Sequence, residues 1–322
     1  MKKIMLAFAI VTTIVSCKNK KEATDVKAKG HDEQLAEMFP APKVDIKTVG
    51  ILLYDGYSTL DAMGPYNVLG ELMGTNVFFV GLHKGLVADG RGMKVQVDTS
   101  IDEVKHLDIL VIPGGFKETY ELTKDTNLLN WIRAIDSSSV YTTSVCTGAW
   151  ILGATGVLKG KEATTHWWGK KILAAEFGAK VQQKRYVRSG KYWTSAGITA
   201  GMDMGLALIN EIRGENYTKA IMLDLEYDPQ PIYKGGSDYN TDTTIVNAMR
   251  TMYDMGMEKV LHPVTTYENI KFDNNKDPFC GMPITTGVVD TVHYNGKIYG
   301  FCSKGCKDGF MKDPAAYAGL YK

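Results

Sequence analysis

The chain has 322 residues, of which 44% are hydrophobic and 23% are charged, and its formal net charge is +1. This composition is typical of a soluble globular protein, and the length suffices for one large domain and a small one. A charge so close to zero gives no electrostatic reason to expect a nucleic-acid partner. The five cysteines stand at positions 17, 146, 280, 302 and 306, in three separate contexts that do not form a disulfide framework.

Residues 1–17 have the organisation of a bacterial lipoprotein signal peptide. A positively charged start, Met1-Lys2-Lys3, precedes an apolar run over residues 4–15 that is too short to cross a bilayer. Cys17 follows Ser16, and this resembles a lipobox in which Cys17 becomes the lipidated N-terminus. An ordinary secretory signal is the alternative. Because Lys18 follows the cysteine, we expect an anchor in a bacterial outer membrane, on its periplasmic or its surface side.

The next segment, residues 18–44, is polar and has no strong apolar period. This pattern predicts a flexible tether, in which His31 is a solvated residue.

From residue 45 to residue 262 the chain alternates predicted strands with predicted helices. We expect strands at 49–54, 76–81, 108–112 and 140–145, a hairpin arm at 93–97, and helices at 66–73, 128–135, 199–209 and 241–257. This alternation predicts an α/β domain whose parallel sheet carries helices on both faces. Asp61, Gly114-Gly115 and Cys146 each follow a strand, so we expect them at the ligand-binding edge of the sheet.

The segment around Cys146 has the pattern of a nucleophile elbow. A β-branched strand ends at Cys146, Thr147-Gly148 forms the turn, and an apolar helix follows over residues 149–152. The start of that helix is expected to favour the thiolate through its unpaired N–H groups and its dipole. A buried cysteine that only packs is the alternative. The N–H groups of Gly114 and Gly115 are candidates for an oxyanion hole, with a plain Gly-Gly turn as the alternative.

Four motifs occur along this region, at residues 112–115 (IPGG), 144–148 (SVCTG), 163–167 (ATTHW) and 194–203 (TSAGITAGMD). Together they resemble the ThiJ/PfpI family of the class I glutamine-amidotransferase-like superfamily, and residues 225–231 (LEYDPQP) are similar to its isonitrile hydratase-like branch. The resemblance implies a flavodoxin-like sandwich, commonly a homodimer, without a cofactor in this domain. It also implies that the helix at 241–257 packs on the domain, and its apolar stripe consists of Ile245, Met249, Met252 and Met255.

The residues beside Cys146 favour the hydratase branch of this family. Many members have a histidine directly after the cysteine, and Thr147 stands there instead, while Asp61 takes the place of a glutamate. The resemblance implies that Cys146 attacks the terminal carbon of an isonitrile and that Asp61 supplies a proton and later activates water. Burial is expected to raise the pKa of Asp61. Thr147 and the glycine pair would orient the substrate. His166 would pack against these residues without contacting the reacting atoms.

Residues 263–273 have little period and are interpreted as a linker, after which residues 274–322 resemble a YHS domain, a short metal-associated module. Cys280, Cys302 and Cys306 supply three thiolates, which suit Zn(II) or Cu(I). A fourth ligand would be His293 for zinc or Met282 for copper. Because some fifty residues build only a small core, we expect a bound metal ion to stabilise this module. The alternative is a disulfide between two of the cysteines, with one thiol left over.

The sequence therefore predicts a membrane-anchored, cysteine-dependent hydratase or hydrolase of small carbon–nitrogen substrates, with a metal-binding accessory module. The alternatives are a stress-related protein that binds electrophiles, oxidants or metal, and a glyoxalase-like or peptidase-like enzyme of the same family.

Overall fold

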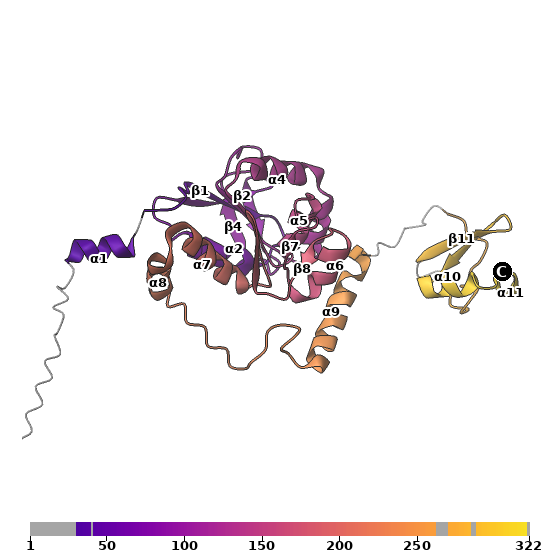
Figure 1. Cartoon of the computed structure of the whole chain (residues 1–322). Helices are drawn as coiled ribbons and strands as arrows, with labels where there is room; N and C mark the ends of the chain where they lie inside the picture. The colour runs from indigo at the N-terminus through magenta and orange to yellow at the C-terminus, as the bar shows by residue number, and fades with distance from the viewer. Residues whose placement is uncertain (1–29, 40, 262–269, 285–287, 321–322) are drawn as a thin grey trace, which may run out of the picture.

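The computed structural model describes residues 30–39, 41–261, 270–284 and 288–320 (Figure 1). The predicted signal peptide with Cys17, residues 18–29 and 40 of the tether, and the greater part of the linker lie outside the described residues. Within the described ranges, no helix is both long enough and apolar enough to span a membrane.

A six-stranded sheet forms the centre of the large domain, in the order β2-β1-β5-β6-β10-β9. Its members are β1 (Thr48–Leu53), β2 (Asn76–Gly81), β5 (Ile109–Ile112), β6 (Tyr141–Val145), β9 (Tyr186–Ser189) and β10 (Tyr192–Ser195). All neighbours are parallel except β10 and β9, which pair antiparallel at the edge. Strands β5 and β6 are buried along their whole length, which explains their continuous apolar and β-branched sequences.

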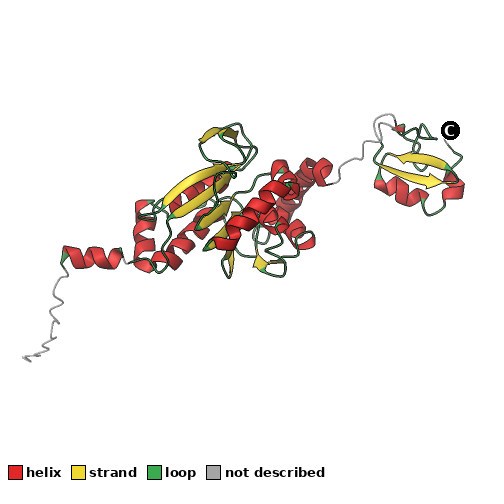
Figure 2. Ribbon diagram, turned by 90° about the horizontal axis from the view of Figure 1, so that it is seen from above, coloured by secondary structure: helices red, strands yellow, loops and turns green. Residues whose placement is uncertain are grey.

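Helices lie on both sides of this sheet (Figure 2), as the sequence predicted. They are α2 (Thr59–Leu69), α3 (Lys117–Glu121), α4 (Thr126–Ser138), α5 (Gly148–Ala154), α6 (Lys170–Ala175), α7 (Ala200–Arg213), α8 (Glu215–Asp224) and α9 (Thr243–Leu261). The 3₁₀ turns are η1 (Leu122–Lys124) and η2 (Trp167–Gly169). Helix α2 packs on α7, and α4 packs on α5. Two small pairs complete the domain: the hairpin of β3 (Gly85–Ala88) with β4 (Lys94–Val97), and β7 (Glu162–Ala163) with β8 (Lys180–Val181).

Helix α2 begins earlier than we predicted. The expected helix started at residue 66, after Pro65, because proline disfavours a helix interior. The structure instead begins the helix at Thr59 and keeps Pro65 inside it, where the ring is buried. Asp61 therefore lies in the first turn of a helix, which fixes its backbone more firmly than the expected loop would.

Helix α9 packs on the domain through a different face from the one we predicted. Met257 is fully buried and the Tyr253 ring packs among domain aromatics. The predicted stripe is exposed instead, with exposed fractions from 38% at Met249 to 75% at Met255. The helical period alone could not separate two apolar faces of one helix.

The described part of the predicted tether is not a free coil. Residues His31–Met38 form the exposed helix α1. Beyond it, the Phe39 ring meets Tyr217 edge-on at 5.6 Å, and the Lys43 N–H donates to the Ile212 carbonyl at 2.8 Å. The chain is thus attached to the large domain before residue 45.

The small C-terminal unit is a hairpin with two short helices. Its elements are β11 (Asp290–Tyr294), β12 (Lys297–Phe301), α10 (Lys304–Phe310) and α11 (Pro314–Tyr317). Asn295-Gly296 forms the hairpin turn with both residues at positive φ, as such turns require. Among the described residues of this unit, the buried apolar cluster consists of Val292, Tyr299, Phe301 and Phe310.

Candidate functional site

Cys146 occupies the predicted nucleophile elbow, between the end of β6 and the start of α5. Its φ is +57°, in the left-handed region that residues other than glycine seldom adopt. The strained backbone is held on both sides: the Cys146 N–H donates to the Ser195 carbonyl at 3.1 Å, and the Thr165 hydroxyl donates to the Cys146 carbonyl at 2.6 Å. These bonds lock the thiol at the carboxyl edge of the sheet.

Asp61 lies beside this thiol in a fully buried position. One carboxyl oxygen, Oδ2, accepts a hydrogen bond from the Gly114 N–H at 3.2 Å, and Oδ1 has no partner with good geometry in the described chain. Burial raises the pKa of Asp61 to about 7, against opposing hydrogen-bonding interactions with Cys146, Gly114 and Ile198. The expected upward shift of this pKa is confirmed, and the carboxyl group titrates near neutrality.

The pKa of Cys146 moves in the opposite direction from our prediction. Burial raises it well above its ordinary value, and the charge of Asp61 raises it further. Hydrogen bonds from the backbone and side chain of Thr147 lower it, but by less. Helix α5 has seven residues, and the favourable effect of its start does not offset the loss of solvation. The resting pair is therefore a protonated thiol beside a carboxyl group that ionises near pH 7.

Gly114 and Gly115 hold the side chains of Asp61 and Thr147 rather than forming a free oxyanion hole. The Gly114 N–H already donates to Asp61, and the Gly115 N–H donates to the Thr147 hydroxyl oxygen at 3.0 Å. That hydroxyl donates back to the Gly115 carbonyl at 2.9 Å. A Cβ on Gly114 would lie only 2.6 Å from the Thr147 nitrogen and 2.9 Å from the Cys146 Cβ. Only glycine lets this loop approach the elbow so closely.

A cavity of about 660 Å³ opens over the thiol. Cys146 and Thr147 line it, whereas the buried Asp61 lies beside the thiol and is not part of the wall. The rest of the wall is mostly apolar and includes three side chains of α9 that we did not assign to the site. The main lining residues are Leu60, Phe116, His166, Trp168, Ile198, Met249, Met252 and Tyr253.

His166 belongs to the wall of this cavity. Burial lowers its pKa to about 4, and the charge of Lys170 lowers it further, so the imidazole is neutral at pH 7. Its ring lies 5.4 Å from that of Tyr253 and 5.6 Å from that of Trp167. The structure thus places His166 in the wall, as a neutral, closely packed ring.

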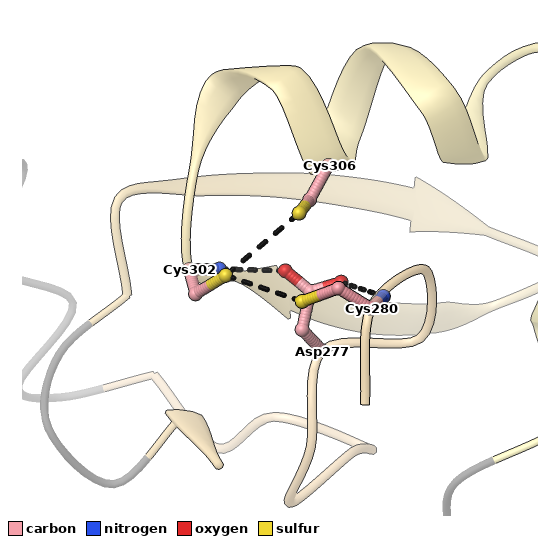
Figure 3. A group of neighbouring side chains, drawn as sticks. All are labelled: Asp277, Cys280, Cys302 and Cys306. Carbon is pink, nitrogen blue, oxygen red and sulfur yellow. Dashed lines mark hydrogen bonds between the residues drawn. The ribbon is translucent and has the colours of Figure 1, made fainter. Parts of the chain in front are cut away.

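The three predicted cysteines of the small unit come together in a second candidate site (Figure 3). The Cys302 sulfur lies 3.5 Å from that of Cys280 and 3.8 Å from that of Cys306. Asp277 joins them, and one potential ligand atom from each of the four residues lies within 4.8 Å of all the others. His293, our candidate fourth ligand for zinc, is exposed on β11 and is not part of this group.

Asp277 is fully buried and ties together the two loops that carry thiols. Its Oδ1 accepts from the N–H groups of Phe279 and Cys280, and its Oδ2 accepts from the Cys302 N–H at 2.8 Å. Sequence reasoning missed this residue, although an aspartate two or three residues before the amides that it caps is a recognisable turn signal. Three soft thiols beside a negative carboxylate form a donor set that fits a thiophilic cation.

Known proteins match both parts of the chain. The DJ-1/PfpI family matches residues 47–211 and the YHS domain matches residues 275–321. Isonitrile hydratase of Pseudomonas putida is 36% identical over 202 residues, which is 63% of this chain and 88% of that protein. The HTH-type transcriptional regulator CdhR of Pseudomonas aeruginosa is 31% identical over 172 residues, 51% of this chain and 50% of the regulator.

Among solved structures, a ThiJ/PfpI family protein from Pseudomonas syringae superimposes with a TM-score of 0.65 at 32% identity, covering 70% of this chain and 93% of that one. The parallel sheet, the elbow at Cys146 and these matches lead to one assignment: the chain belongs to the DJ-1/PfpI family and carries a YHS domain at its C-terminal end.

Proposed function

We propose that the large domain is a cysteine-dependent hydratase that converts isonitriles to N-substituted formamides. The observation that carries this proposal is the buried carboxyl group of Asp61 beside Cys146, whose thiol lies in the wall of an apolar cavity. An isonitrile is small, apolar and electrophilic at its terminal carbon, so it matches both the cavity and the nucleophile. The likeness to isonitrile hydratase of Pseudomonas putida supports the same reaction.

In the proposed reaction the Cys146 thiol gives its proton to the Asp61 carboxylate as the sulfur forms a bond to the terminal carbon. Asp61 then returns this proton to the same carbon, which leaves a neutral thioimidate on Cys146. Next, Asp61 takes a proton from water as the water oxygen adds to that carbon, and the nitrogen takes a proton from a second donor. As the carbon–sulfur bond breaks, Asp61 returns its proton to the sulfur and the hydroxyl proton of the adduct replaces the one that the second donor gave, which releases the formamide and restores the thiol.

The protonation states of the resting pair support this chemistry over a sensor of oxidants. Redox-sensing cysteines have low pKa values and are accessible to solvent. Cys146 is only 5% exposed and its pKa is raised. Such a thiol reacts with a neutral substrate that enters the cavity and triggers proton transfer to Asp61.

The proposal extends to the assembly and the location of the protein. We propose that Cys17 is lipidated and anchors the chain to an outer membrane, and that the large domain forms a homodimer. Mass spectrometry of the N-terminal peptide from membranes tests the first part, because diacylglyceryl on Cys17 is expected. Sedimentation of a chain that begins at Lys18 tests the second part.

For the YHS domain, we propose that Cys280, Cys302 and Cys306 hold one Zn(II) or Cu(I) ion and that Asp277 orients them. When bound, the ion would supply cross-links between loops that the small core alone stabilises weakly. The carboxylate oxygens are engaged with backbone N–H groups, which fits an orienting role for Asp277 better than direct ligation.

The decisive experiment measures formamide release from a small alkyl isonitrile by the chain from Lys18 onward, beside Cys146→Ala and Asp61→Asn. We expect turnover by the parent and none above background in Cys146→Ala. Asp61→Asn is expected to lose at least about 100-fold in kcat, as removal of a general acid–base group does. An Asp61→Asn variant with full turnover would rule out the proton-transfer role.

A further inference from the structure

The proposed reaction requires a proton donor that the pair of Asp61 and Cys146 does not supply. Asp61 serves the carbon that is bonded to sulfur, because its carboxyl group lies beside the thiol. The adjacent nitrogen must also gain a proton when water adds, and it lies on the side of the carbon away from the sulfur. A donor for this atom belongs on the cavity wall that faces Cys146.

Helix α9 contributes a phenol to that cavity, Tyr253. Its ring stacks on Trp168 with centroids 5.5 Å apart and planes at 27°, and it meets Phe116 edge-on at 5.5 Å. The neighbouring Asp254 fastens the same turn of helix by accepting a hydrogen bond from the Trp168 indole at 2.7 Å. The ring is therefore held in place by its neighbours, as a group that must meet a substrate atom needs to be.

The Tyr253 hydroxyl is free to bond a ligand. The side chain is partly exposed, and no hydrogen bond joins its hydroxyl to any described residue. A charge on Cys146 raises the pKa of Tyr253, in addition to the effect of burial, so the phenol and the thiol interact electrostatically. The phenol consequently stays protonated and can donate.

Other polar groups of the cavity are less suited to this task. The Tyr57 hydroxyl also lacks a partner, but its oxygen is buried and not open to the cavity, and Arg91 is exposed to solvent. The Ser58 hydroxyl is a much weaker acid than a phenol. Thr59 and Asp89 bond to each other, and Asp89 also accepts from backbone N–H groups. The His166 ring is packed so tightly that a Cβ on Gly197 would lie 2.6 Å from its Cδ2.

We infer that Tyr253 is a catalytic residue whose phenol donates a hydrogen bond to the substrate nitrogen and protonates it as water adds; this rests on the proposed function. The hydroxyl proton of the adduct returns to the phenolate through solvent when the carbon–sulfur bond breaks, so the cycle is balanced. Tyr253 lies outside residues 47–211, which match the family. The match to the family therefore does not by itself point to this residue.

The test uses Tyr253→Phe in the chain from Lys18 onward, since phenylalanine keeps the ring packing and removes only the hydroxyl. We expect kcat for an alkyl isonitrile to fall about 100-fold with little change in KM, as loss of a positioned donor does. The matched control is Tyr233→Phe, because Tyr233 is 84% exposed and does not line the cavity. The kcat of this variant should stay within twofold of that of the parent. Unchanged kcat in Tyr253→Phe would overturn the inference.

A second readout separates this inference from the proposed function. The rate of Cys146 modification is followed by peptide mass spectrometry, with acrylamide, whose carbonyl accepts a hydrogen bond, and with methyl methanethiosulfonate, which adds directly at sulfur. We expect Tyr253→Phe to slow the acrylamide reaction about tenfold and to leave the second reaction unchanged. This result would support the donor role even if the parent did not hydrate isonitriles. Equal slowing of both reactions, or neither, would overturn it.

Discussion

The charge of Asp61 raises the pKa of Cys146, whereas the hydrogen bond with the Cys146 thiol lowers that of Asp61, so the carboxyl group loses its proton first. Above about pH 7 the pair therefore holds one proton, and it resides on sulfur. A substrate that bonds to the sulfur allows this proton to move to the carboxylate. The activity of the site should follow the ionisation of Asp61 rather than that of an ordinary thiol.

This relationship predicts the pH dependence of the reaction. We expect kcat/KM to rise with pH through about 7, the pKa of Asp61, and then to reach a plateau, because only the carboxylate accepts the thiol proton. The measurement is kcat/KM for a neutral isonitrile between pH 5 and pH 9. A rise centred near the ordinary cysteine pKa of about 8.5 would contradict the assignment of the base to Asp61.

The same shift predicts a pH-dependent stability. The folded pKa of Asp61 is raised, so the folded state binds more protons than the unfolded state between about pH 4 and pH 7. The contribution of Asp61 to stability is present below pH 4 and is lost as pH rises through 7. Relative to the parent, Asp61→Asn should therefore become more stable as the pH rises from 5 to 8, by up to roughly 3 kcal/mol.

Urea unfolding of the parent and of Asp61→Asn at pH 5 and at pH 8 measures this difference in the free energy of unfolding. Asp55→Asn is a suitable control, since Asp55 is exposed in the turn between β1 and α2 and accepts a hydrogen bond from the Ala88 N–H. Its effect should be equal at the two pH values. If the free energies of unfolding of both variants changed with pH in the same way, a raised pKa of Asp61 in the folded state would be ruled out.

The close approach of Gly114 to the elbow predicts a large effect of one methyl group. In Gly114→Ala the new Cβ would meet the nitrogen and the hydroxyl of Thr147 at 2.6 Å, so the loop and the elbow must separate. We expect about 1–3 kcal/mol of destabilisation and about a 100-fold loss of kcat through displacement of the thiol. Gly30→Ala is the control, because nothing lies within 4 Å of its Cβ. Native kcat in Gly114→Ala would show that this approach has no role in catalysis.

The parts of the fold that local patterns determine were predictable from the sequence. A buried β-branched strand, a turn and an apolar helix identify the elbow of Cys146 because all three features lie within residues 140–152. The alternation of strands and helices likewise predicts the parallel sheet. The grouping of Cys280 with Cys302 and Cys306 was expected from the resemblance to a YHS domain.

Features that depend on distant packing were not predictable in this way. The direction of the Cys146 pKa depends on total burial and on Asp61, which lies 85 positions earlier in the sequence. The face by which α9 packs is decided by aromatic neighbours such as Trp168, and two apolar faces compete on that helix. The start of α2 was predicted too late because Pro65 disfavours a helix interior. In the structure Pro65 lies inside the helix, and burial of its ring offsets this cost.

The YHS domain offers a prediction that depends on Asp277 alone. Asp277→Asn keeps the shape of the side chain but replaces one acceptor oxygen with an NH₂ group, which cannot accept from the backbone N–H groups of Cys280 or Cys302. The loops that carry these thiols should then lose their alignment. We expect the affinities for Zn(II) and Cu(I) to fall about 10- to 100-fold, as they do when orienting residues are removed.

Competition with a chromophoric chelator measures both affinities on the chain from Lys18 onward. Asp308→Asn removes an equal charge from the exposed side of α10, outside the cluster, and should bind both ions like the parent. Cys302→Ser should abolish tight binding, because Cys302 lies between the other two sulfurs. If Asp277→Asn matched the parent while Cys302→Ser failed, the three thiols would be aligned without the carboxylate, and its backbone hydrogen bonds would serve only to fold the loop.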